Sequence, residues 1–189
     1  MEQIIEWDRQ LYLFLNNLGS PSWDPLWLMI TYKWTWIPLY VFLLYLIFRK
    51  FGAKGTFITA IIIALLITAS DQLANVFKHG FERPRPCGQE GVMEYARFIA
   101  VRCGSFGYFS AHASSSTGLA IIVGLLLKKD YPKLPYLLLI WATIVAYSRI
   151  YVGVHYPLDV VTGMLIGGLL GYLFYRLHLF LAEKFMVNF

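Results

Sequence analysis

Residues 134–175 read LPYLLLIWATIVAYSRIYVGVHYPLDVVTGMLIGGLLGYLFY, which is two apolar runs separated by a polar junction. The runs cover residues 134–147 and 160–175, and their flanks extend each toward the roughly 20 residues that a membrane-spanning helix needs. The junction, SRIYVGVHYPLD at 148–159, contains Ser148, Arg149, His155 and Asp159. We therefore expect two transmembrane helices joined by a turn that carries reactive groups.

The composition of the whole chain agrees with a membrane protein. Its 189 residues are 58% hydrophobic and 14% charged, whereas ordinary soluble domains carry about 25% charged residues. The formal charge of +5 would suggest nucleic acid as a partner of a soluble protein. Here the basic residues lie at the ends of apolar runs or in one polar loop, so we expect membrane association and no nucleic acid.

Three further apolar runs, at residues 34–48, 56–77 and 118–127, bring the number of expected spans to five. Residues 22–33 are a candidate for a sixth, although charged residues and a proline interrupt them. The predicted fold is all-α, a polytopic transmembrane helix bundle of five to six membrane segments. The bundle and its loops form one membrane domain, residues 22–189, preceded by a separate segment at 1–21.

Residues 1–21 have the pattern of an amphipathic helix, with apolar residues at three- and four-residue steps and polar residues between them. Such a helix lies either in the membrane interface or against neighbouring helices. In the last span, Gly163, Gly167 and Gly171 recur every four residues. This spacing indicates a face for close helix packing, unless the glycines are incidental.

The distribution of Lys and Arg predicts the orientation. The segments 49–55 and 128–133, with Arg176 and Lys184, alternate onto one side of the membrane, and the positive-inside rule makes that side cytoplasmic. The loop 79–113 then lies on the other side, together with the polar junction. We expect a multi-pass protein of the cytoplasmic (inner) membrane whose reactive groups face the periplasm or cell exterior.

The outer loop begins with KHGFERPRP, which supplies Lys78, Arg83 and Arg85. Positive residues are disfavoured on this side of the membrane. Their presence therefore indicates anion binding rather than a membrane-topology signal.

Two other polar motifs are expected on the same side. In YFSAHASSS (108–116), Ser110 is placed to cap the following helix, whose first amides form an anion site beside His112. In the junction, His155 and Asp159 are one helical turn apart, and Arg149 supplies a planar fork suited to phosphate oxygens.

These motifs resemble the three signature motifs of the type 2 phosphatidic acid phosphatase superfamily, which is related to the vanadium haloperoxidases. The first is KxxxxxxRP from Lys78 to Pro86, and the third is SRxxxxxHxxxD from Ser148 to Asp159. The second is a variant of PSGH in which Phe109 and Ala111 replace Pro and Gly.

The resemblance implies a role for each residue. His155 would be the nucleophile that forms a phosphohistidine, Asp159 would orient it, and His112 would be the general acid. No metal or other cofactor would be required. The phosphate would be held by Lys78, Arg85, Arg149, Ser110 and the amide of Ala111, and Arg83 is a candidate for headgroup contact.

The two cysteines of the chain, Cys87 and Cys103, lie in the outer loop. In an oxidising compartment they would form a disulfide that restrains the loop. The alternative is a pair of free thiols.

The predicted function is hydrolysis of a lipid phosphate or diphosphate. Candidate substrates within the family are polyprenyl diphosphate, lipid A phosphate, phosphatidylglycerol phosphate and phosphatidic acid. A haloperoxidase activity is disfavoured because those enzymes are soluble. A membrane protein that binds or transports an anionic lipid without hydrolysis is the other alternative.

Overall fold

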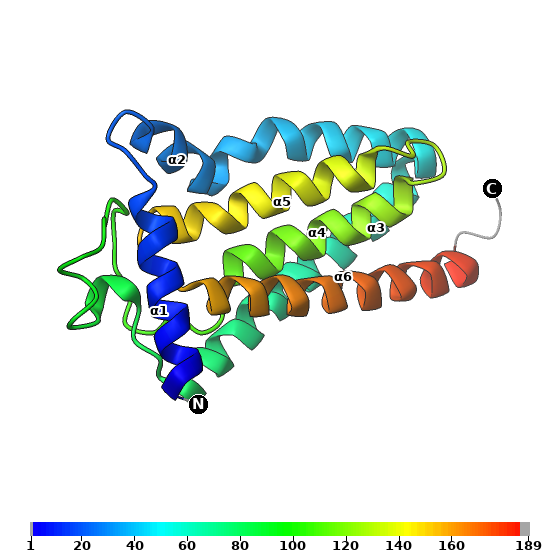
Figure 1. The fold of residues 1–189 in the computed structure, drawn as a ribbon. Coiled ribbons are helices and arrows are strands. Elements are labelled where there is room, and N and C mark those ends of the chain that lie inside the picture. Colours follow the sequence, from blue (N-terminus) through cyan, green and yellow to red (C-terminus); the bar gives the residue numbers. More distant parts are fainter. Residues whose placement is uncertain (1, 186–189) are drawn as a thin grey trace.

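The computed structural model describes residues 2–185, and it is built from helices joined by loops (Figure 1). Within this described part there is no β-strand, only an isolated bridge between Pro84 and Phe106. The predicted all-α class is confirmed. The elements are α1 (Glu2–Asn17), α2 (Asp24–Thr31), η1 (Lys33–Trp36), α3 (Ile37–Phe81), η2 (Pro86–Gly88), α4 (Ala111–Leu127), α5 (Leu134–Tyr151) and α6 (Pro157–Phe185).

Helix α3 supplies two of the membrane segments. Its 45 residues would extend about 68 Å if straight, more than twice the roughly 30 Å of a bilayer's hydrocarbon core. The helix instead turns back at Gly52, whose φ of 64° and ψ of −173° are not helical and suit a residue without a Cβ. Figure 1 shows the two arms of α3 running out and back.

Five segments therefore run along the bundle, namely the two arms of α3 and the helices α4, α5 and α6. Helices α5 and α6, and the segment Lys33–Phe81 that contains α3, are long and apolar enough to cross a membrane, and α4 is a shorter apolar helix. Residues 22–33 do not add a sixth span. Helix α2 has only eight residues, or about 12 Å of rise, and it packs against α5.

The core of the bundle lies where α4 meets α3, α5 and α6. Leu66 of α3, Ile122 and Leu127 of α4, and Ala142 of α5 are almost fully buried in one apolar cluster. The three predicted glycines lie against the backbone of α4. A Cβ added at Gly167 would be 2.2 Å from the Ser114 carbonyl oxygen, so α6 approaches α4 more closely than a larger residue permits.

Helix α1 crosses the end of the bundle at which α5 ends and α6 begins (Figure 1). It is amphipathic as predicted, but its polar side packs on the protein, through buried Asp8 and Asn16 with Tyr12 between them. Asn16 donates hydrogen bonds to the Ile150 and Tyr151 carbonyl oxygens. The apolar side chains Ile4, Trp7, Leu11, Phe14 and Leu18 are exposed.

Candidate active site

The turn between α5 and α6 places a histidine and a carboxylate together, as the spacing predicts. His155 and Asp159 are 2% and 0% exposed, and His155 Nδ1 lies 3.5 Å from Asp159 Oδ2. The same Oδ2 accepts a hydrogen bond of 3.0 Å from the Tyr156 amide. Because Nδ1 faces Asp159, Nε2 is the ring nitrogen left for a substrate.

The environment keeps the His155 ring neutral. The residue lies in the turn outside the membrane segments, and its burial lowers its pKa to about 4. Asp159 opposes this shift in the pKa, while the nearby charges of Arg85 and Arg149 add to it. A neutral imidazole retains the lone pair that a nucleophile needs.

The start of α4 brings the second histidine to the same place. The Ser110 hydroxyl caps the helix by accepting from the Ala113 amide, and the Ser110 amide donates to the Asp159 carbonyl oxygen at 2.9 Å. Ala111, which stands where the family motif has glycine, is the first residue of the helix. Its φ is not positive, because among the described residues other than glycine only Glu82 has a positive φ. The Cβ of Ala111 is therefore not strained. His112 lies within electrostatic range of His155 and three cations.

Those three cations come from three different elements. Lys78 lies in the last turn of α3, Arg85 lies in the outer loop, and Arg149 lies in the last turn of α5. All three are half-buried. The Nε of Arg85 donates to the Phe106 carbonyl oxygen at 3.0 Å, which leaves its Nη atoms for a ligand. Three cations beside two histidines suit a phosphate group.

Arg149 is oriented by a residue that the sequence did not indicate. Its Nη1 donates to the Thr31 hydroxyl at the end of α2, while its buried Nε has no hydrogen-bond partner among the described residues. Thr31 lies in the segment that we considered as a sixth span. That segment instead contributes to the site from outside the bundle.

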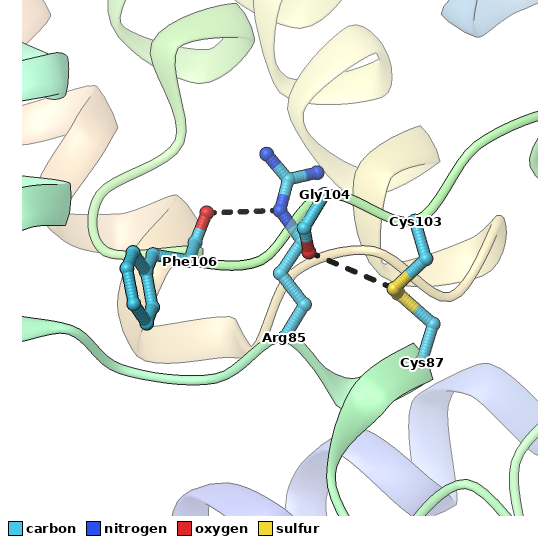
Figure 2. Close-up of a disulfide and its surroundings, with 5 residues drawn as sticks. All are labelled: Arg85, Cys87, Cys103, Gly104 and Phe106. Atoms are coloured by element: carbon cyan, nitrogen blue, oxygen red, sulfur yellow. Dashed lines mark hydrogen bonds between the residues drawn. A yellow bond between two sulfur atoms is a disulfide. The ribbon is translucent and has the colours of Figure 1, made fainter.

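The outer loop is restrained next to Arg85. Cys87 and Cys103 form a disulfide with a Cα–Cα distance of 6.0 Å, and Figure 2 shows Gly104 directly beside the Arg85 side chain. A Cβ added at Gly104 would be 3.2 Å from Arg85 Cζ, and one added at Gly107 would be 3.1 Å from Asp159 Oδ2. The loop thus needs small residues where it passes the site.

Arg83, our candidate for headgroup contact, bridges two carboxylates. Its Nη1 donates to Asp159 Oδ1 at 2.7 Å, and its Nη2 donates to Asp8 Oδ2 of α1. Both terminal nitrogens therefore donate to carboxylates, and contact with a lipid headgroup stays a prediction. The sequence offered no signal for Asp8, because one acidic residue among several on an amphipathic helix is unremarkable.

A cavity of about 610 Å³ opens beside His112. Its lining is mainly apolar and comes from both arms of α3 and from α4 and α5, including Tyr40, Ile67, Leu119 and Trp141. Lys33 and Asp71 also line it. A chain-like apolar group could occupy this cavity while an attached phosphate reaches the cations.

The fold and the site define a class, the integral-membrane phosphatases that act on lipids, and comparison with known proteins identifies the family. The family model of the PAP2 superfamily matches residues 56–182. The chain belongs to this superfamily, which confirms the resemblance seen in the three motifs. It is a multi-pass membrane lipid phosphatase.

Two curated relatives carry different substrate names. A lipid A 4'-phosphatase of Bacteroides thetaiotaomicron is 38% identical over 187 residues, covering 97% of this chain and 80% of that protein. An undecaprenyl-diphosphatase of Sulfolobus acidocaldarius is 32% identical over 178 residues, covering 91% and 79% respectively.

Two solved structures share the fold. The Bacillus subtilis PAP2-type phosphatidylglycerolphosphate phosphatase has a TM-score of 0.74 at 21% identity, covering 98% of this chain and 89% of that one. LpxE of Aquifex aeolicus has a TM-score of 0.68 at 24% identity, covering 88% and 93%. At these identities the likeness concerns the fold.

Proposed function

We propose that this lipid phosphatase hydrolyses a phosphate monoester or diphosphate of a membrane lipid, through a phosphohistidine and without a metal ion, at the outer face of the cytoplasmic membrane. The observation that carries the proposal is the pairing of His155 with Asp159 beside three cations. Of the substrates considered, the 4'-phosphate of lipid A has the strongest support, since the relative of that name is 38% identical over nearly the whole chain.

In the first step, His155 Nε2 attacks phosphorus and the bond from phosphorus to the lipid oxygen breaks. His112, whose protonated form is favoured once the anionic phosphate is bound, donates its proton to that oxygen, so the lipid leaves as a neutral alcohol or, from a diphosphate, as a protonated phosphate. Lys78, Arg85 and Arg149 neutralise the charge that builds on the phosphoryl oxygens. Asp159 stabilises the positive charge that develops on the imidazole.

In the second step, water attacks the phosphohistidine. Neutral His112 accepts a proton from the water, and the bond between phosphorus and Nε2 breaks to release inorganic phosphate. We infer that the lipid tail occupies the apolar cavity beside His112, with the scissile bond next to the two histidines.

The test uses purified protein in detergent with EDTA and a panel of lipid A, undecaprenyl diphosphate, phosphatidylglycerol phosphate and phosphatidic acid. We expect phosphate release, fastest from lipid A, and a loss of at least about 1,000-fold in His155→Ala. Labelled phosphate should remain on the wild-type protein in alkali and leave in acid, as a phosphohistidine does.

The matched control is His79→Ala, because His79 is an exposed histidine in the last turn of α3. It should keep activity within about twofold of wild type. Hydrolysis by His155→Ala at the wild-type rate would contradict the mechanism. Binding of these lipids without release of phosphate would favour the non-hydrolytic alternative.

A further inference from the structure

Helix α1 reaches the catalytic carboxylate through one arginine. Arg83 divides its guanidinium between two carboxylates, donating from Nη1 to Asp159 Oδ1 at 2.7 Å and from Nη2 to Asp8 Oδ2. Asp8 Oδ1 in turn accepts a hydrogen bond of 2.8 Å from the Leu158 amide, in the first turn of α6. Asp8 therefore contacts both the arginine and the helix that carries Asp159.

The three charged side chains that make these contacts are largely buried. The side chains of Asp8, Arg83 and Asp159 are 7%, 17% and 0% exposed. The Arg83 guanidinium also lies 4.2 Å from the centre of the Tyr156 ring, next to the catalytic histidine. Charges in such surroundings require partners with defined geometry, because desolvation is costly.

The sharing of Arg83 has a consequence for Asp159. If Arg83 were paired with Asp159 alone, its charge would cancel most of the field with which the carboxylate stabilises a positive His155. Asp8 accepts a hydrogen bond from the other side of the guanidinium. With its carboxylate, the group of Asp8, Arg83 and Asp159 has a net negative charge. Arg83 can then hold Asp159 Oδ1 in position while Oδ2 remains directed at His155 Nδ1.

We propose that Asp8 and Arg83 are positioning residues for the reaction, and that helix α1 is thereby part of the active site. They act through Asp159, which fixes the orientation of the nucleophilic ring. The inference rests on the proposed function, since it assigns a task to residues around His155. Asn16, which fixes the other end of α1 to the end of α5, keeps Asp8 in register.

The variants that test this are Asp8→Asn, Arg83→Gln, their double variant and Arg83→Lys. We expect Asp8→Asn and Arg83→Gln each to lower kcat about 10- to 100-fold, as removal of outer supporting groups does at other sites, with KM changed less than about threefold. The double variant should be no slower than Arg83→Gln, because both changes break one unit. Arg83→Lys should have a higher kcat than Arg83→Gln, because it keeps the positive charge. Its kcat should stay below that of wild type, because an ammonium lacks the planar fork of the guanidinium.

One measurement and two control variants separate positioning from a general loss of structure. Inhibition by inorganic phosphate reports on Lys78, Arg85 and Arg149, and its constant should stay within about threefold of wild type. The matched controls are Glu6→Gln, which removes an exposed carboxylate from α1, and Arg102→Gln, which removes an exposed arginine from the outer loop. Both should leave kcat unchanged.

Three results would overturn the inference. The first is a kcat within twofold of wild type in both Asp8→Asn and Arg83→Gln, and the second is a loss of phosphate inhibition that matches the loss of kcat. The third is a kcat of Arg83→Lys no higher than that of Arg83→Gln. Each would occur with an active wild-type protein and an inactive His155→Ala. A wild-type protein without phosphatase activity, or an active His155→Ala, would instead refute the proposed function on which this inference rests.

Discussion

The proposed chemistry depends on the state of one ring, that of His155. Burial is the main cause of its lowered pKa, and Asp159 does not offset the burial. The ring is therefore unprotonated at neutral pH, although a carboxylate lies 3.5 Å away. In the proposed mechanism Asp159 stabilises the positive charge that the ring carries after it attacks phosphorus.

The pH profile should reflect this state. With a pKa of about 4 for His155, the nucleophile should stay available from pH 8 down to about pH 5. Below about pH 4, kcat/KM should fall about tenfold per pH unit as the ring is protonated. The measurement is kcat/KM from pH 2.5 to 8, with the ionisation of the substrate phosphate followed separately by ³¹P NMR. A decline already centred near 6.5, after correction for the substrate, would show that burial does not control His155.

The same protonation affects stability with a definite sign. The unfolded chain has a histidine pKa near 6.5 and binds the proton more readily than the folded chain. The protonation of His155 therefore does not change the free energy of unfolding above that pH. As the pH falls from about 6.5 toward 4, it lowers the free energy of unfolding progressively.

The packing of α4 against α6 determines how far apart the residues of the site lie. Helix α4 carries His112 and α6 carries Asp159, and the two helices meet through glycines of α6 against the α4 backbone. The contact is continuous with the site, since a Cβ at Gly163 would lie 2.5 Å from the Ser110 carbonyl oxygen. The separation of α4 and α6 thus sets the position of the second motif relative to the third.

Two adjacent glycines of α6 provide a matched test of this contact. Gly167→Ala would place a Cβ 2.2 Å from the Ser114 carbonyl oxygen, whereas Gly168→Ala would meet nothing within 4 Å. We expect Gly167→Ala to destabilise the protein by about 1–3 kcal/mol through overpacking. Gly168→Ala should be neutral or stabilising, by up to about 1 kcal/mol, because alanine favours helix. Thermal unfolding in detergent compares them, and equal melting temperatures would contradict the role of this face.

The arrangement of the entire chain gathers the reactive groups at one end of the bundle. The bend of α3 at Gly52 and the connection 128–133 lie at the opposite end, with Arg49, Lys50, Lys129 and Lys133. By the positive-inside rule, this separation favours our prediction that the site faces the periplasm or cell exterior. The exposed apolar side of α1, at the end that bears the site, suits a membrane interface.

Labelling in intact cells tests the orientation. The structure has no free cysteine within its described residues, so an introduced thiol can be followed. We expect Glu94→Cys, in the outer loop, to react with a membrane-impermeant maleimide in whole cells, and Lys129→Cys to react only after lysis. The reverse pattern would place the site in the cytoplasm. Both positions are exposed, so accessibility within the protein does not differ between them.

Much of this protein was evident from its sequence. Apolar runs of sufficient length predict helices because the bilayer leaves backbone groups no other partners. The three motifs, through their resemblance to the family, predicted a site of His155, Asp159, His112, Lys78, Arg85 and Arg149, and the structure brings these residues together. The alternation of apolar runs also predicts that all three motifs meet at one end of the bundle.

The tertiary structure alone reveals what supports those residues. Asp8 and Arg83 are far apart in sequence from Asp159, and no local spacing links them; they meet because α1 crosses the end of the bundle and buries its polar side. Thr31 likewise reaches Arg149 only through packing. Periodicity along one helix determines which residues share a face, but the partner that each face meets depends on how separate helices pack.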